Sequence, residues 1–165
     1  MEIIVKTLET EEEIKGKAYV HYTAWQEAYE GIVDRAFLDR LSVEKCEEIA
    51  RKFRTDNLVA VDGDRVVGFA AYGKARDEDL ENAGEVSAIY ILADYYSQGV
   101  GYRLMKEALS RLAEYPQVEV WVLKDNVRAI SFYKKCGFEF DGKEQTLELG
   151  KPIVEVRMIY KRGGV

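Results

Sequence analysis

The chain has 165 residues, of which 47% are hydrophobic, so it can bury a core and we expect one domain over residues 1–165. Acidic residues outnumber basic ones by 30 to 24, and the formal charge of −6 argues against nucleic-acid binding and favours a cationic partner. The sequence has no apolar run of membrane-spanning length, no signal-peptide pattern, two cysteines without metal-ligand spacing and one histidine. We therefore predict a cytoplasmic protein with reduced thiols, no membrane contact and no metal site.

A short strand at residues 3–5 and a long helix are expected to open the fold. Thr10 and Glu13 have the spacing of a capping box, which predicts that the helix begins there and runs through Trp25. The single histidine, His21, lies on or beside the apolar stripe of this helix. A structural role is favoured for it over a catalytic one.

Two shorter helices and a hairpin follow. Asp34 and Ser42 are residues of the types that cap helices, and each precedes a run of apolar residues with helical spacing. Apolar residues then fill 57–61 and 65–72 around an Asp-Gly-Asp turn at 62–64, which is typical of a β-hairpin.

The next stretch has the pattern strand, glycine turn, helix. Residues 85–92 are mostly β-branched, aromatic or aliphatic, Gly99 and Gly101 lie in the turn, and apolar residues recur at helical spacing from Leu104 to Leu112. Such a turn lets the backbone approach a ligand, and the free N–H groups of the first helical turn bind anions. The pattern indicates a pyrophosphate site, although an ordinary strand–turn–helix crossover has the same outline.

The rest of the chain is predicted to complete the sheet. Residues 118–123 alternate as a strand, Asn126 begins a helix, and two strands at 138–140 and 153–160 close the fold. Residues 142–152 are expected to connect these last two strands.

Two nucleotide-binding motifs are excluded at the glycine turn. The segment from Gly99 to Leu104 lacks the third glycine of the dinucleotide fingerprint, and no acidic ribose ligand ends a second strand about 20 residues on. No Lys-Ser or Lys-Thr pair follows, as a Walker loop requires. A nucleotide-binding crossover fold is therefore the least favoured reading.

A second block of residues suggests a family. It has the form Asn-x-x-Ala-x-x-Phe-Tyr-x-x-x-Gly-Phe, with fixed positions at Asn126, Ala129, Phe132, Tyr133, Gly137 and Phe138. Together with Gly99-x-Gly101, it resembles the GNAT superfamily of acyl-CoA-dependent N-acyltransferases over about residues 57–162. The resemblance implies an α/β (α+β) fold with a mixed, largely antiparallel sheet, helices on both faces, and a pair of splayed strands that binds acyl-CoA.

The resemblance also implies which residues bind the cosubstrate acetyl-CoA. Backbone groups of the splayed strand and of the glycine turn are expected to hold the pantetheine arm and the pyrophosphate. One position departs from the family, because Tyr96 stands where the motif has Gln or Arg. The expected cofactor-binding residues are Ile89, Tyr90, Ile91, Tyr96, Ser97, Gln98, Gly99, Val100, Gly101, Tyr102, Asn126 and Tyr133.

Acetyl transfer to an amine needs a base for the ammonium proton, an oxyanion donor and an acid for the leaving thiolate. Glu85 occupies the position where several GNAT enzymes carry the base, with an exposed strand-end glutamate as the alternative. Tyr133 shares a helix face with Asn126 and is expected to be the acid, with a core tyrosine as the alternative.

The acceptor pocket is less well defined. Trp25 and Tyr29, followed by Gly31, have a spacing that resembles a GNAT subgroup in which this region forms one wall of the acceptor pocket; a core position for both aromatics is the alternative. Residues 74–84 contain several carboxylates, which either form a solvated loop or attract amines.

The leading functional hypothesis is an acetyl-CoA-dependent N-acetyltransferase acting on a primary amine of a polyamine-like molecule or a peptide, in a chain that can form a homodimer. The alternative is a catalytically silent acyl-CoA-binding regulatory module. The presence of Glu85 and Tyr133 favours the enzyme. The departure from the family motif at Tyr96 leaves the regulatory module as the alternative hypothesis.

Overall fold

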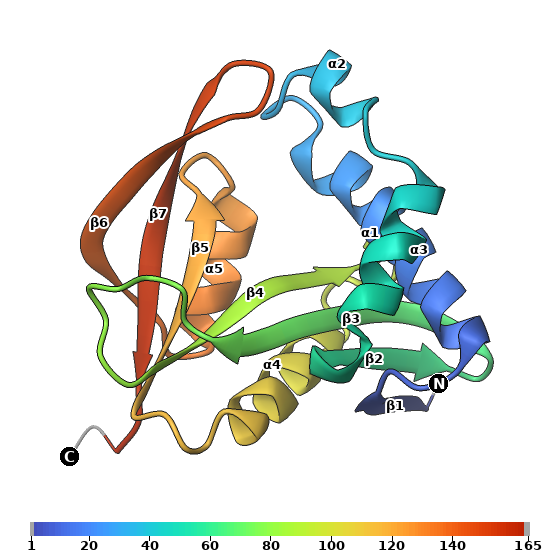
Figure 1. Cartoon of the computed structure of the whole chain (residues 1–165), viewed down its shortest axis with the longest axis horizontal. Helices are drawn as coiled ribbons and strands as arrows, with labels where there is room; N and C mark the ends of the chain where they lie inside the picture. The colour runs from blue at the N-terminus through green and yellow to red at the C-terminus, as the bar shows by residue number, and fades with distance from the viewer. Residues whose placement is uncertain (1, 164–165) are drawn as a thin grey trace.

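The computed structural model describes residues 2–163, so the terminal residues of the predicted domain, residue 1 and residues 164–165, lie outside it. The described chain forms one sheet of seven strands with helices on both faces (Figure 1). The strands are β1 (Ile3–Thr7), β2 (Asn57–Asp62), β3 (Arg65–Lys74), β4 (Ala83–Ile91), β5 (Gln117–Leu123), β6 (Glu139–Glu148) and β7 (Pro152–Lys161). The helices are α1 (Glu11–Tyr29), α2 (Arg35–Leu38), α3 (Val43–Lys52), α4 (Val100–Arg111) and α5 (Val127–Lys135).

The strand order is β1-β2-β3-β4-β5-β7-β6, and every neighbouring pair is antiparallel except β4 and β5. One core cluster joins the sheet to α4 and α5, and a second joins it to α1 and α3. The predicted fold class, a mixed and largely antiparallel sheet covered on both faces, is therefore confirmed.

The parallel pair β4–β5 separates soon after it begins. Its ladder holds three residue pairs and ends where Glu85 faces Glu119. On the other edge of β4, Tyr72 pairs with Val86 and Ala71 with Ala88, so Ser87 is an extra residue in the ladder. Such a bulge bends a strand and increases its twist, and it lies at the point where β4 diverges from β5.

Three of the predicted helix caps are confirmed, and one is not. Thr10 and Glu13 form the capping box at α1, and the side chains of Ser42 and Asn126 accept hydrogen bonds from the first turns of α3 and α5. Asp34 precedes α2 but makes no capping hydrogen bond, so that prediction is wrong. A β-carbon on Gly150 would lie 2.7 Å from the Asp34 β-carbon, so Asp34 lies against the β6–β7 turn.

The predicted strand at 138–140 and the long connection at 142–152 are also wrong. β6 runs from Glu139 to Glu148, and the connection to β7 is only Leu149–Lys151. Almost every residue of β6 is exposed because this strand lies at the edge of the sheet. With neither face buried, β6 has no hydrophobic alternation from which a strand can be predicted. None of the helices in residues 2–163 is long and apolar enough to cross a membrane.

Candidate active site

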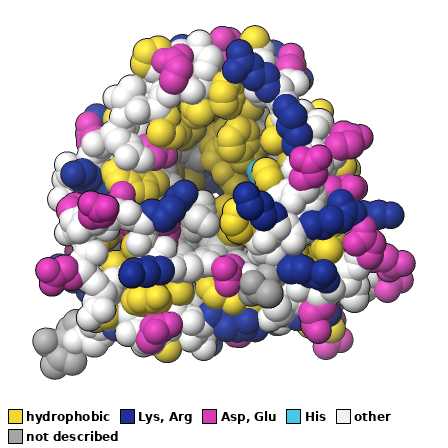
Figure 2. Space-filling model, viewed as in Figure 1, with side chains coloured by type: hydrophobic (Ala, Val, Ile, Leu, Met, Phe, Trp, Pro, Cys, Tyr) yellow, Lys and Arg dark blue, Asp and Glu magenta, His cyan; other side chains and the backbone are white. Residues whose placement is uncertain are grey.

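A cavity of about 520 Å³ lies in the gap between the diverging strands, and we call it the gap cavity. Its walls come from β4, the turn before α4 with the first residues of that helix, the end of β5, α5 along its length and the end of α1. Figure 2 shows a hollow on the face of the molecule drawn in Figure 1, between the β6–β7 hairpin and α1, with hydrophobic side chains inside it and charged side chains around it.

The gap cavity brings together nearly all the predicted cofactor-binding residues. The ones that line it are Ile89, Tyr90, Ile91, Tyr96, Ser97, Gly99, Val100, Gly101, Tyr102, Asn126 and Tyr133. Gln98 does not line it; its side-chain amide donates a hydrogen bond of 2.9 Å to the Asp94 carbonyl instead. β4 has no ladder partner on this side beyond Glu85 in the described chain, so its backbone edge is open to the cavity.

The glycine turn has the geometry of an anion site. Gly99 is the N-cap of α4 with a φ of +81°, a left-handed conformation that favours glycine. No side chain of the described residues caps this helix, so its first N–H groups and its positive dipole end remain available to a ligand. Gly101 has a second role, because an added β-carbon would lie 2.8 Å from Cδ1 of Ile91 and 3.1 Å from the Phe132 ring.

Arg128 supplies a cation where the sequence motif appeared to lack one. Its guanidinium carbon lies 3.2 Å from the centre of the Tyr96 ring, and both residues line the gap cavity. Tyr96, which stands at the Gln or Arg position of the motif, thus stacks with an arginine from α5. Sequence reasoning missed Arg128, although it is a basic residue within the Asn126 block and beside a predicted anion site.

Tyr133 is buried, with 8% of its surface exposed, and packs against Phe132 and Phe138. Burial, followed by the nearby Tyr90 and Cys136, raises the pKa of the Tyr133 hydroxyl above its ordinary value. The hydroxyl therefore keeps its proton at neutral pH, as a proton donor requires.

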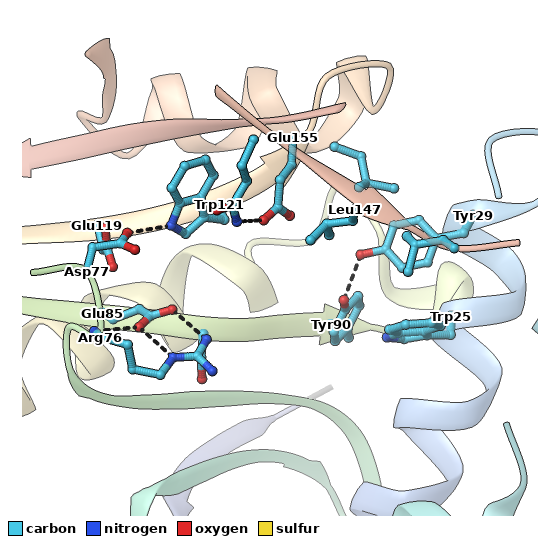
Figure 3. Close-up of a pocket in the computed structure, with 14 residues that line it drawn as sticks. Trp25, Tyr29, Arg76, Asp77, Glu85, Tyr90, Glu119, Trp121, Leu147 and Glu155 are labelled. Atoms are coloured by element: carbon cyan, nitrogen blue, oxygen red, sulfur yellow. Dashed lines mark hydrogen bonds and ion pairs between the residues drawn. The ribbon is translucent and has the colours of Figure 1, made fainter. Parts of the chain in front are cut away.

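A second cavity, of about 500 Å³, adjoins the first, and we call it the acidic pocket. Four carboxylates line it, Asp77, Glu85, Glu119 and Glu155, together with one cation, Arg76. Figure 3 shows these side chains on β4, β5, β7 and the loop before β4, with Trp25, Tyr29, Tyr90 and Trp121 on the remaining sides.

The two cavities share the wall residues Tyr29, Ser87, Tyr90 and Trp121. Tyr29 and Tyr90 join across this wall by a hydrogen bond of 2.7 Å between their hydroxyl groups. Trp25 and Tyr29 thus line the acidic pocket, and Tyr29 also lines the gap cavity; their role in an acceptor pocket stays a prediction. The tip of the β6–β7 hairpin covers the acidic pocket. Leu149 and Ile153 of this tip pack with the cluster of Val33, Leu38 and Leu123.

Glu85 lies at the start of β4 and is 4% exposed. It is held by Arg76: the arginine Nε is 3.3 Å from Oε1, Nη2 is 3.1 Å from Oε2, and the backbone N–H donates to Oε1 at 3.4 Å. Glu85 is therefore neither an exposed strand-end residue nor a free carboxylate.

Glu119 has the opposite environment. Its side chain is 1% exposed, and neither carboxyl oxygen accepts a hydrogen bond from a donor group of the described residues. Its closest cation is Arg157, whose Nη1 is 3.7 Å from Oε2. Burial, followed by the neighbouring Asp77, raises the pKa of Glu119 to about 8.

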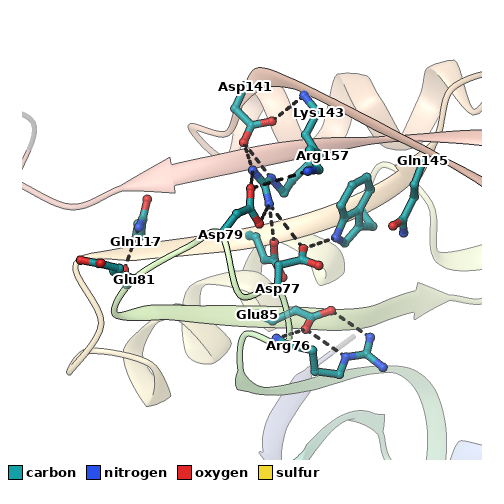
Figure 4. A network of polar contacts seen from close by, with 12 residues as sticks. Arg76, Asp77, Asp79, Glu81, Glu85, Gln117, Asp141, Lys143, Gln145 and Arg157 are labelled. Atoms are coloured by element: carbon teal, nitrogen blue, oxygen red, sulfur yellow. Dashed lines mark hydrogen bonds and ion pairs between the residues drawn. The ribbon is translucent and has the colours of Figure 1, made fainter.

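Arg157 holds the acidic loop before β4 against the sheet (Figure 4). It forms a two-pronged contact with Asp79 at 2.9 and 2.8 Å, a contact of 2.7 Å with Asp141, and one of 3.5 Å with Asp77. Asp77 in turn accepts a hydrogen bond of 2.7 Å from the Trp121 indole. The carboxylates of residues 74–84 are thus partly fixed in the pocket wall rather than all solvated.

The residues that sequence reasoning missed here are Arg76, Glu119, Glu155 and Arg157. Three of them carried a signal. Glu119, Glu155 and Arg157 interrupt otherwise apolar strands, and a charged residue in such a strand needs a partner or a function.

His21 contributes no acid–base group. Its ring lies among Trp25, Phe69 and Tyr90, and burial lowers its pKa to about 4, so the imidazole is neutral at pH 7. This environment agrees with the structural role that the sequence favoured.

Comparison with known proteins agrees with this geometry. The model of the acetyltransferase (GNAT) family matches residues 18–138. The uncharacterized N-acetyltransferase YuaI of Bacillus subtilis is 31% identical over 130 residues, which cover 74% of this chain and 73% of that protein. The peptidyl-lysine N-acetyltransferase YjaB of Salmonella typhimurium is 30% identical over 139 residues, covering 82% and 86%.

Among solved structures, the PaiA N-acetyltransferase of Thermoplasma acidophilum, in complex with coenzyme A, superposes with a TM-score of 0.74 at 20% identity and covers 98% of this chain and 99% of its own. At that identity the likeness shows the fold alone. The family model spans the glycine turn, the Asn126 block and most of the two cavities, and the chain is therefore a member of the GNAT family of N-acetyltransferases.

Proposed function

We propose that this protein transfers the acetyl group of acetyl-CoA to a primary amine of a cationic acceptor, either a polyamine-like molecule or a lysine-like side chain of a peptide. The observation that carries the proposal is the pair of cavities with a common wall. One offers an open strand edge and an uncapped helix N-terminus, and the other offers four carboxylates.

The gap cavity fits acetyl-CoA. The N–H groups at Gly99–Tyr102 would hold the pyrophosphate, and Arg128, supported by Tyr96, would add a cation. The open edge of β4 near Ile89–Ile91 would pair with the amides of the pantetheine arm and offer a backbone N–H to the thioester carbonyl. Bound acetyl-CoA supplies an activated acyl group, and this chain supplies its position.

The acidic pocket fits an amine that carries positive charge. Its carboxylates outnumber its one lining cation by four to one, and its aromatic walls suit an alkyl chain with an ammonium group. The related YjaB is named a peptidyl-lysine N-acetyltransferase, which supports an aminoalkyl acceptor. Both a polyamine and a lysine side chain present this group.

The attacking amine must first lose a proton, because an alkylammonium with a pKa of about 10.4 is neutral in only about one molecule per few thousand at pH 7. A carboxylate of the acidic pocket takes that proton; Glu85 is the one that the family resemblance implies. The amine nitrogen then bonds to the thioester carbon, the carbon–sulfur bond breaks, and Tyr133 protonates the leaving thiolate, recovering a proton from the attacking nitrogen.

Thiol release from acetyl-CoA, measured with polyamines, lysine-containing peptides, amino acids and aminoglycosides, tests this proposal. We expect turnover with the first two groups and a rate close to the acceptor-free background with the last two. If acetyl-CoA binds but no amine causes thiol release, the silent binding module is correct and the enzymatic proposal fails.

A further inference from the structure

The two carboxylates at the point where β4 and β5 diverge have opposite partners. Glu85 and Glu119 are paired residues of the same ladder and line the same pocket. Glu85 is neutralised by Arg76 through both its oxygens. Glu119 is buried with neither oxygen accepting a hydrogen bond from a donor group in the described chain, a state that is costly for an ionised carboxylate and tolerable for a protonated one.

Building on the proposed function, we propose that Glu119 is the group that accepts the proton of the acceptor's ammonium, and that Glu85 with Arg76 shapes the pocket around it. The free protein holds Glu119 protonated. When a cationic amine enters, Glu119 releases this proton to solvent, and its carboxylate then takes one proton from the ammonium nitrogen. The neutral amine attacks the thioester, and the second nitrogen proton replaces the one that Tyr133 gives to the thiolate.

The charged groups around Glu119 favour this cycle. Three carboxylates oppose the ionisation of Glu119: Asp77 from the loop before β4, Glu85 from β4 and Glu155 from β7. Two arginines favour its ionisation: Arg157 from β7, and Arg76, which lies beside Glu85. Arg157 is largely occupied by Asp79 and Asp141, so its effect on Glu119 is weak. An arriving ammonium group adds the missing positive charge.

The other carboxylates of the pocket each accept a hydrogen bond from another side chain. Asp77 accepts from the Trp121 indole and contacts Arg157; a hydrogen bond from the protonated Glu119, followed by these two groups, holds the pKa of the Asp77 carboxyl below its ordinary value. Glu155 accepts a hydrogen bond from Gln145. Among the described residues, Glu119 alone of the four accepts no hydrogen bond from a donor group, and the pKa of about 8 that follows from its burial is close to working pH, where a general base is most effective.

The decisive experiment compares Glu119→Gln with Glu85→Gln, using the best acceptor from the amine panel. Kcat/KM is measured from pH 6 to 10, and amine binding is followed by calorimetry with CoA present, in phosphate and in Tris. Since these buffers have different heats of ionisation, the difference between them gives the number of protons released per amine bound.

For the wild type near pH 7 we expect about one proton released per amine bound. Glu119→Gln should release almost none and lose roughly 10²-fold in kcat/KM near pH 7, with the deficit shrinking as pH rises and the amine deprotonates without help. Glu85→Gln should keep the proton release. Glu119→Asp, which retains a titrating carboxyl, should restore the release and part of the rate.

Two results would overturn the assignment: proton release that persists in Glu119→Gln, or a kcat/KM within threefold of wild type at every pH. Loss of proton release in Glu85→Gln alone would make Glu85 the base instead. Unfolding of Glu119→Gln at pH 7 is not expected, because the variant replaces a neutral buried acid by a neutral amide; the wild-type calorimetry tests the proton release independently. Absence of turnover in the wild type would refute the proposed function rather than the role of Glu119.

Discussion

The gap cavity and the acidic pocket share a wall but are built in different ways. The gap cavity comes mainly from two stretches of chain, Ser87–Tyr102 and Asn126–Lys135, and its expected ligand contacts are largely backbone groups. The acidic pocket takes side chains from α1, the loop before β4, β4, β5 and the β6–β7 hairpin. The gap cavity therefore depends on local backbone geometry, and the acidic pocket on side chains that tertiary structure assembles.

The largest effect is expected at the glycine turn. Gly101→Val should raise the Kd for acetyl-CoA by more than about 100-fold, because its side chain would push Ile91 and Phe132 apart and distort the first turn of α4. Overpacking of this kind also costs about 1–3 kcal/mol of stability. Calorimetric titration with acetyl-CoA measures the first effect and denaturant unfolding the second.

Gly73→Val is the matched control, since Gly73 lies in β3 with no atom within 4 Å of an added β-carbon and no left-handed backbone. It should leave both cavities and the acetyl-CoA affinity unchanged. Equal losses in the two variants would mean that the gap cavity does not depend on its local backbone geometry.

A smaller effect, on rate alone, is expected at Tyr133. Tyr133→Phe retains the ring that packs against Phe132 and Phe138 and removes only the proton donor. Kcat should fall by about 10- to 10³-fold while the Kd for acetyl-CoA changes little. Steady-state kinetics and calorimetry separate the two quantities; a raised Kd with kcat preserved would assign Tyr133 to binding, and no change in either would leave it a core residue.

Variants of Arg128 test whether a side chain of the gap cavity contributes to acetyl-CoA affinity. Arg128→Ala should raise the Kd for acetyl-CoA by about 10-fold, since one charge-assisted contact to an exposed phosphate is lost. Arg128→Lys should recover part of the affinity, and the loss in Arg128→Ala should shrink at high salt. Titrations at two salt concentrations measure this, and a salt-independent Kd would contradict the phosphate contact.

The last effect is on stability rather than on binding or rate, and it concerns the pH dependence of the acidic pocket. The folded-state pKa of Glu119, about 8, exceeds its ordinary value of 4.5, so the folded state binds more protons than the unfolded state between these values. Stability from this group is therefore greatest below about pH 5 and is lost as pH rises toward 8. Glu119→Gln removes the titrating group, so the stability of the wild type relative to this variant should fall over that range.

Denaturant unfolding of both proteins at pH 5, 6.5 and 8 measures the difference. Glu85→Gln serves as the control because it removes a carboxyl from the same pocket that is already paired with Arg76. A constant difference between wild type and Glu119→Gln would show that Glu119 ionises normally in the folded protein.

Several features follow from local sequence alone. The capping box at Thr10, the Asp-Gly turn before β3 and the glycine turn before α4 are set by backbone preferences of a few neighbouring residues. The Asn126 block places Tyr133 two helical turns beyond its cap, which positions it in the gap cavity. The residues that line the gap cavity could be predicted because they come from a few local stretches of chain.

Tertiary structure alone decided the rest. The length of β6 could not be predicted from the sequence, because an exposed edge strand needs no hydrophobic alternation. Several carboxylates lie within reach of Arg76 and Arg157. Only the packing of the loop before β4 on β5 and β7 gives Glu85 a close ion pair with Arg76 and leaves Glu119 without a hydrogen-bond donor among the described residues, with Arg157 3.7 Å away. A sequence specifies that a carboxylate is present, but its protonation depends on burial and on neighbours distant in the chain.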